Sequence, residues 1–140
     1  MSEALRCEWH VPNDSLHRRV IEIMSKRILK ISSRTVAGAT VVDLEGAINI
    51  SNSTTLRTSL FETLQATPRL ALNMSGIQYI DSSGIATLIE ALKKARALNR
   101  DFHLFGVGQT VRDVLKLTNL LGVFQIFESE KDALETHGER

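Results

Sequence analysis

The chain has 140 residues, 43% of them hydrophobic, which suits one domain that buries a core without disulfide staples. Seventeen Lys and Arg against sixteen Asp and Glu leave a net charge of +1, which argues against disorder and against a basic field for nucleic acid. Cys7 is the single cysteine, so an internal disulfide and a cysteine-based zinc cluster are excluded. Apolar stretches fall far short of the roughly 20 residues that cross a bilayer, and we predict a cytoplasmic protein without stable membrane insertion.

Residues 1–27 are predicted to be a leader or accessory segment that precedes a domain over residues 28–140. Residues 1–30 hold six Lys or Arg against four Asp or Glu. Apolar residues recur at the four-residue interval of one helix face: Leu16, Val20, Met24 and Ile28. The pattern predicts a basic amphipathic helix over residues 15–27. That helix could pack on its own domain, on a dimer mate or on a membrane surface, and the natural start could instead lie at Met24.

A β-hairpin is expected to open the domain. Apolar and β-branched residues predict strands over 28–35 and 39–44, joined by a turn at Ala37 and Gly38. Leucines at helical spacing then predict a helix through residues 56–64. Its cap is expected among Ser51, Asn52 and Ser53, and Pro68 should stop it.

The rest of the chain is predicted to alternate strands and helices. A strand over 70–74 should end in a turn at Ser75 and Gly76. The later elements are a helix over 85–95, a strand over 102–107, a helix over 111–121 closed by Gly122, and a strand over 123–127. Such alternation implies crossover connections. The predicted fold class is therefore α/β, with a mixed, mostly parallel β-sheet covered by helices and an antiparallel edge from the hairpin.

Asp81-Ser82-Ser83-Gly84 stands where a strand-side loop is expected to turn into a helix. A hydroxyl there would be exposed beside the unpaired N–H groups and the positive end of the helix dipole. A phosphate on Ser82 or Ser83 would gain about 0.3–1 kcal/mol from that position. Spacing alone favours the simpler interpretation that Asp81 or a serine is no more than the N-cap.

The surrounding sequence, LALNMSGIQYIDSSGIATL over residues 70–88, closely resembles the signature of the STAS domain as found in bacterial anti-sigma factor antagonists. Further segments resemble the same family: VVDLEGAI over 41–48, LFGV over 104–107, residues 110–120 and LGVF over 121–124. The likeness covers residues 28 to about 134 and implies a single STAS-like domain.

The resemblance implies a switch protein with no catalytic activity and no cofactor of its own. In the family the first serine of this motif, here Ser82, is phosphorylated by an anti-sigma factor that is itself a serine kinase, and Ser83 would be a cap or secondary acceptor. The unphosphorylated antagonist captures the anti-sigma factor and frees a sigma factor. Phosphorylation blocks capture until a PP2C-type phosphatase removes the phosphate. Asp81 and Gly84 would shape the switch turn.

Proximity to the switch predicts a partner footprint on the loop after the second strand and on the exposed side of the Ser82 helix. Its expected members are Asn49, Ile50, Ser51, Asn52, Thr87 and Glu90. The chain has Asn49 and Asn73 where the family often has aspartate, and phosphorylation would be slower if those aspartates help to position the serine. The loop at 106–110 also lacks a proline that members often carry.

Other functions remain open at this point. Within the fold, the chain could be a constitutive scaffold, such as a stressosome-type subunit or a partner of a lipid-transport ATPase, or a small-molecule or nucleotide sensor, and a homodimer is possible. A serine hydrolase is disfavoured because Ile80 and Gly84, not two glycines, flank Ser82 at two residues' distance. The histidines show no i, i+4 pair that would indicate a metal site: His10, His17, His103 and His137.

Overall fold

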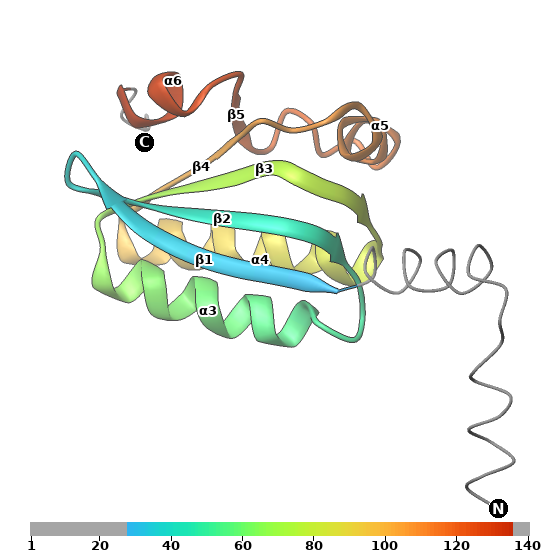
Figure 1. The fold of residues 1–140 in the computed structure, drawn as a ribbon, viewed down its shortest axis with the longest axis horizontal. Coiled ribbons are helices and arrows are strands. Elements are labelled where there is room, and N and C mark those ends of the chain that lie inside the picture. Colours follow the sequence, from blue (N-terminus) through green and yellow to red (C-terminus); the bar gives the residue numbers. More distant parts are fainter. Residues whose placement is uncertain (1–27, 136–140) are drawn as a thin grey trace, which may run out of the picture.

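The computed structural model describes residues 28–135, within which five strands form one mixed sheet in the order β1-β2-β3-β4-β5. The strands are β1 Leu29–Val36, β2 Ala39–Ile48, β3 Arg69–Ile80, β4 Asp101–Phe105 and β5 Gln125–Phe127. The helices are α3 Ser53–Ala66, α4 Ser82–Leu98, α5 Gln109–Leu117 and α6 Glu130–Glu135. Figure 1 shows α3 and α4 side by side on one face of the sheet. α5 contributes Val111 and Leu115 to the same buried cluster as these helices, whereas Ala133 of α6 belongs to a second cluster. The predicted helix over 15–27 lies outside the described residues.

The opening hairpin is confirmed. β1 pairs antiparallel with β2, and Val36 lies opposite Ala39 across a two-residue turn. Both turn residues have positive φ, 52° at Ala37 and 79° at Gly38, which is what a type I′ hairpin turn requires. The other strand pairs are parallel, so the predicted mostly parallel sheet with one antiparallel edge is confirmed.

The predicted turn at Ser75 and Gly76 is wrong, because β3 continues through both residues to Ile80. Its pairing with β2 shifts register twice, between Asp43 and Glu45 and between Gly46 and Ala47. A Cβ on Gly76 would lie 2.7 Å from the carbonyl oxygen of Leu44. This glycine therefore allows a close approach of two strands at an irregularity and does not end a strand.

Three smaller expectations also need correction. α5 ends at Leu117, not at residue 121, and β5 begins only at Gln125, because Asn119 takes a left-handed conformation with φ of 60°. The short helix α6 was not expected. Asn52 occupies the N-cap position of α3, but its side chain makes no capping hydrogen bond.

The core lies mainly between the sheet and the paired helices α3 and α4. Buried leucines of the helices, Leu56, Leu60, Leu64 and Leu88, belong there to one cluster with inward side chains of the strands. The strand residues include Leu44 of β2, Leu72 of β3 and Leu104 of β4. A smaller cluster under α6 holds Val41, Ala71, Phe105 and Ala133. Since β2 and β3 are parallel, their carboxyl ends meet at one edge of the sheet, where α3 and α4 both begin. Within residues 28–135 no helix has the length and apolar character needed to cross a membrane.

Candidate functional site

Ser82 lies at the sheet edge where β3 passes into α4. Only Asp81 separates the last strand residue, Ile80, from the first helical residue, Ser82, so the expected loop is reduced to one residue. The backbone N–H of Asp81 donates to the carbonyl oxygen of Ile48 at 3.1 Å, which ties the end of β3 to the end of β2. The side chain of Ser82 is exposed.

Asp81 is the N-cap of α4. Its Oδ1 accepts hydrogen bonds from the backbone N–H groups of Ser83 at 3.0 Å and Gly84 at 3.1 Å. The Ser83 hydroxyl donates to the same oxygen at 2.6 Å. Of the two adjacent serines, Ser83 is thus bonded into the cap, whereas Ser82 is an exposed residue.

The carboxyl of Asp81 is held ionised. Burial raises its pKa, but hydrogen bonds from the Ser83 hydroxyl and from the backbone N–H groups of Gly84, Ser83 and Ile50 lower it more, and the pKa lies below its usual value. Two N–H groups at the start of α4 are therefore already bonded to an anion. The expectation that such groups stand free for a phosphate is wrong for Ser83 and Gly84.

Gly84 allows the start of α4 to rest directly on the ends of two strands. A Cβ at this position would lie 2.6 Å from Cγ1 of Ile80 and 2.7 Å from Cγ2 of Ile48. Both isoleucines are buried. Close packing therefore requires a glycine here, and its role in a switch stays a prediction.

The loop after β2 is held next to this turn, as proximity along the predicted fold suggested. Asn49 Oδ1 accepts from the backbone N–H of Ser51 at 2.9 Å and from its hydroxyl at 2.8 Å. Asn52 Oδ1 accepts from the N–H of Asn49 at 3.0 Å, and Asn52 Nδ2 donates to the Ala47 carbonyl oxygen at 2.9 Å. Within this loop the side chain of Ile50 is exposed, at 79%. The backbone N–H of Ile50 donates a hydrogen bond to Asp81.

Thr87 does not lie on the exposed side of α4, where the sequence placed it. The residue is only 4% exposed, and its hydroxyl donates to the carbonyl oxygen of Ser83 at 3.0 Å and more weakly to that of Ser53 at 3.4 Å. It therefore joins α4 to the first turn of α3. Glu90 is exposed, and its carboxylate pairs with Arg57 of α3 at 2.8 Å.

Two exposed apolar residues near the switch turn were missed by sequence reasoning. Tyr79, three residues before Ser82, is 51% exposed, and Ile28 is 56% exposed. Tyr79 pairs with Ala47, whose N–H donates to the carbonyl oxygen of Ile28 at 3.2 Å. Ile77 and Ile80 are both buried although they are three residues apart, so β3 does not keep a two-residue alternation through the register shifts, and the sequence pattern did not show which face Tyr79 occupies.

Asn73 lies away from the switch turn. It stands in β3, seven residues or about 23 Å of extended strand before Ile80, and its Nδ2 donates to Asp43 at 2.7 Å while its Oδ1 accepts from the hydroxyl of Ser75 at 2.7 Å. Of the two asparagines singled out from the sequence, only Asn49 contacts the loop that borders Ser82.

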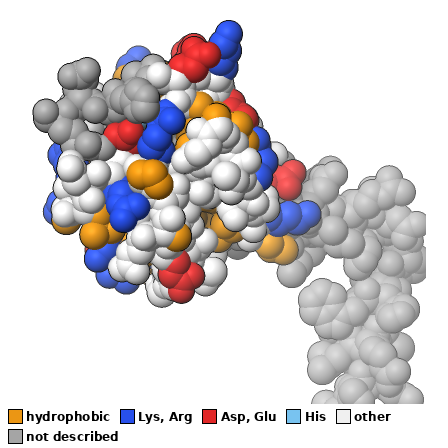
Figure 2. All heavy atoms as spheres, turned by 90° about the vertical axis from the view of Figure 1, so that its left-hand side faces the viewer, with side chains coloured by type: hydrophobic (Ala, Val, Ile, Leu, Met, Phe, Trp, Pro, Cys, Tyr) orange, Lys and Arg blue, Asp and Glu red, His pale blue; other side chains and the backbone are white. Residues whose placement is uncertain are grey.

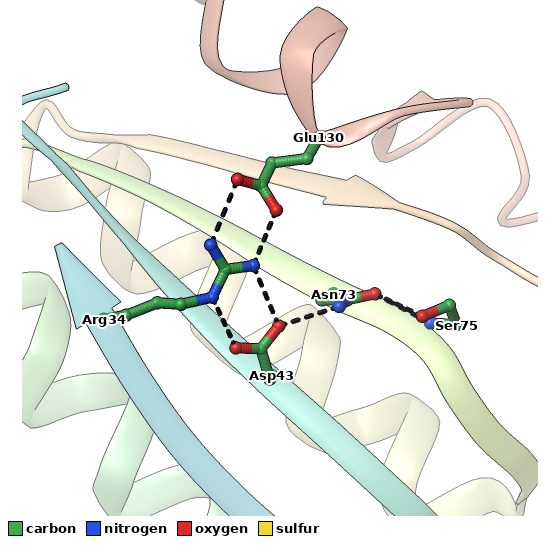
Figure 3. A network of polar contacts seen from close by, with 5 residues as sticks. All are labelled: Arg34, Asp43, Asn73, Ser75 and Glu130. Atoms are coloured by element: carbon green, nitrogen blue, oxygen red, sulfur yellow. Dashed lines mark hydrogen bonds and ion pairs between the residues drawn. The ribbon is translucent and has the colours of Figure 1, made fainter. Parts of the chain in front are cut away.

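Asn73 belongs instead to a polar network that joins β1, β2, β3 and α6 (Figure 3). The Arg34 guanidinium donates to Asp43 at 2.8 Å and to Glu130 at 2.6 Å. These hydrogen bonds from Arg34 hold the pKa of both carboxyls below their usual values. The network fastens α6 to the hairpin. No sequence pattern indicates it, because its members are far apart in the chain.

The described residues offer no metal centre. No three His, Cys, Asp or Glu side chains between residues 28 and 135 are grouped so that they could hold a metal ion. His103 is buried in β4, with Nδ1 bonded to the carbonyl oxygen of Ala133 at 2.9 Å. It lies in the sheet interior and packs against Phe127.

Comparison with known proteins places this arrangement in a family. Residues 30–133 match the STAS domain. The chain is 23% identical over 106 residues to BtrV of Bordetella bronchiseptica, a protein named as a candidate anti-sigma factor antagonist, and the match covers 75% of this chain and 91% of BtrV.

Solved structures share the fold. An anti-sigma factor antagonist from Mycobacterium paratuberculosis matches with a TM-score of 0.71 at 21% identity, over 78% of this chain and 93% of that protein. The antagonist SpoIIAA in its unphosphorylated form matches with a TM-score of 0.65 at 18% identity, over 76% of this chain and 94% of that one. The phosphorylated form of Bacillus SpoIIAA matches with a TM-score of 0.60 at 17% identity, over 76% of this chain and 97% of that one. The STAS match over residues 30–133 takes in most of the chain, including residues of all five strands of the mixed sheet, and the chain belongs to the STAS domain family.

Proposed function

We propose that the protein is an anti-sigma factor antagonist, a protein-interaction module that is switched by phosphorylation of Ser82 and has no catalytic activity of its own. The observation that carries the proposal is the difference between two adjacent serines: Ser83 is bonded into the cap of α4, and Ser82 is exposed beside it. The names of the relatives support this function, and SpoIIAA, which shares the fold, has been solved in a phosphorylated form.

The partner footprint surrounds Ser82 and includes apolar side chains. Ile50 is 79% exposed and Tyr79 is 51% exposed. Tyr79 precedes Ser82 by three residues, and the N–H of Ile50 bonds to Asp81. Exposed apolar side chains beside polar groups are typical of protein interfaces, in which aromatic residues often dominate the affinity. Ser51 and Glu90 complete the surface, whereas Thr87 contributes through the packing of α4 on α3.

The far end of the domain has a different character. Figure 2 shows the end with the β1–β2 turn, where Lys and Arg lie among Asp and Glu and hydrophobic atoms form scattered spots. The larger exposed apolar side chains include Ile28, Ile50 and Tyr79, which cluster instead at the Ser82 end. This difference favours the Ser82 end as the surface that binds the anti-sigma factor, a serine kinase in the cytoplasm.

Phosphorylation would oppose that interface through charge. A phosphate adds about −1.5 to −2 charges beside the ionised Asp81, whose oxygen already uses the N–H groups of Ser83 and Gly84. A partner that closes over Ser82 must desolvate this charge, at a cost of roughly 3–4 kcal/mol, which corresponds to a loss of affinity of about 10²- to 10³-fold. A PP2C-type phosphatase would restore binding.

The test is intact-mass and phosphopeptide analysis of the protein recovered from its own cells. We expect one phosphate on Ser82, its loss in Ser82→Ala and its persistence in the matched control Ser83→Ala. A chain that carries no phosphate under any growth condition, and that binds its partner equally well as wild type and as Ser82→Ala, contradicts the switch.

A further inference from the structure

An apolar patch lies on the face of β1, β2 and β3 that points away from α3 and α4, called here the open face. Leu29 packs against the main core, so Ile28, the next residue in the alternation, points to the opposite side. Ile28 and Tyr79 flank Ala47 in one row across the three strands, and paired residues share a face. Ala47 is only 1% exposed, while both of its neighbours are about half exposed.

The open face has room for another element. A hollow of about 480 Å³ lies on it beside the patch. It is lined by Lys30, Ser32, Asp43, Glu45, Asn73 and Ser75, among others. Figure 1 shows α3 and α4 on the other side of these strands. α5 packs against β3, and α6 packs against β3, β4 and β5. The patch and the hollow together form a continuous surface next to the Ser82 end.

The chain that leads into Ile28 carries a matching apolar stripe. Leu16, Val20 and Met24 precede Ile28 at four-residue intervals, so a helix through them has its apolar side in line with Ile28, which already belongs to the patch. Thirteen helical residues span about 20 Å, whereas three strands span about 10 Å. The segment is therefore long enough to pass over Tyr79.

Charge favours the same contact. Residues 15–27 hold four Lys or Arg against one Glu. On the open face, Asp43, Glu45 and Glu130 outnumber Lys30 and Arg34 by one. The tether at Ile28 adds a high effective concentration, so that a modest contact suffices for binding.

We propose that residues 15–27 bind as an amphipathic helix across the open face of their own domain and cover Ile28, Ala47 and Tyr79. The contact shields Tyr79 and so competes with the anti-sigma factor for the Ser82 end. This regulatory consequence rests on the proposed function, but the contact itself needs neither a partner nor a phosphate.

Paramagnetic relaxation in the full-length, unphosphorylated protein tests the contact. A nitroxide is attached at His17→Cys in a Cys7→Ser background, and backbone amide signals are recorded. We expect strong broadening at Ala47 and Tyr79 relative to Ala37 at the far end of the sheet. Val20→Ser with Met24→Ser should abolish this broadening. The matched control, Glu22→Ser with Lys26→Ser, changes the opposite helix side at the same spacing without altering net charge and should preserve it.

Two results would overturn the proposal. One is equal broadening in the spin-labelled protein with Val20 and Met24 intact and in its Val20→Ser, Met24→Ser variant. Such broadening would come from the covalent connection at Ile28 alone and not from a contact of the apolar stripe. The other is broadening that appears in a mixture of spin-labelled chains and isotope-labelled, spin-free chains, since the occupant would then be a second copy. Neither result bears on whether Ser82 is phosphorylated, which the phosphopeptide analysis decides separately.

Discussion

Substitution of Gly84 by alanine tests the close packing that fixes the switch turn. The added methyl group would lie 2.6 Å from Cγ1 of Ile80 and 2.7 Å from Cγ2 of Ile48. Both isoleucines are at most 2% exposed, and they belong to the two strands on which α4 rests, so they cannot swing into solvent to make room. The start of α4 must therefore move outward by several tenths of an ångström.

Two opposing contributions set the size of the effect. Alanine is preferred to glycine inside a helix by up to about 1 kcal/mol, and this gain is smaller at the third helical position. Overpacking in a filled core costs typically 1–3 kcal/mol. We expect a net loss of about 1–2 kcal/mol in the free energy of unfolding, which lowers Tm by roughly 4–12 °C in a domain of this size.

Thermal and urea unfolding followed by circular dichroism would measure this loss. Gly122→Ala is the matched control, because a Cβ at Gly122 meets nothing within 4 Å, and its Tm should change by less than about 3 °C. If Gly84→Ala is as stable as the control, the start of α4 is not packed on Ile48 and Ile80, and the account of the turn fails.

Three further predictions concern neighbouring residues. Tyr79→Ser should weaken binding of the anti-sigma factor in calorimetric titration by about tenfold or more. Leu117→Ser on α5, which changes another exposed apolar residue, should not; equal effects would remove Tyr79 from the footprint. Thr87→Val should cost about 0.5–1.5 kcal/mol of stability in urea unfolding through the lost hydrogen bond to Ser83, with partner affinity unchanged in the variant that remains folded. The pKa of Asp81 is lowered in the folded chain, so its stabilising contribution is present above the unfolded-state pKa near 3.9 and is lost as the pH falls through the folded pKa. Asp81→Asn should therefore flatten the fall in the free energy of unfolding at acid pH, measured from pH 2 to 6. An unchanged fall would contradict the cap.

The fold was largely predictable because its local signals agree with one another. The small residues Ala37 and Gly38 favour a tight turn, and the structure uses them for one. The apolar spacing of the helix after Asp81 fits a buried face on the sheet, and α4 is the longest helix among residues 28–135. Where the conformation of an element depends on its own residues, the sequence pattern was sufficient to predict it.

The errors arose where a distant segment decides the outcome. Gly76 reads as a turn residue, but the backbone of β2 passes 2.7 Å from its absent Cβ position, and only the paired strand explains the glycine. Thr87 reads as polar and therefore exposed, but the first turn of α3 covers it. The Arg34 network crosses 96 residues between its ends. No single-sequence periodicity contains these contacts.

The N-cap of α4 leads to a last prediction, about the stability of the phosphorylated chain. Sequence reasoning assigned a gain of about 0.3–1 kcal/mol to a phosphate at a helix start. In the structure the N–H groups of Ser83 and Gly84 are already bonded to the ionised Asp81, so a phosphate on Ser82 gains less from the helix and is repelled by that carboxylate. The two contributions oppose each other, and each is below about 1 kcal/mol at an exposed position.

Phosphoserine incorporated at position 82 should therefore change Tm by no more than about 3 °C, while it lowers partner affinity by about 10²-fold or more. In an Asp81→Asn background the repulsion is absent, and the same phosphate should raise Tm relative to the unphosphorylated Asp81→Asn chain. Calorimetry of the four proteins gives the coupling between the two groups directly. A large stabilisation by phosphate in the presence of Asp81, with no further gain in Asp81→Asn, would mean that the phosphate finds donors elsewhere and that the switch acts by reshaping the turn, not by placing charge in an interface.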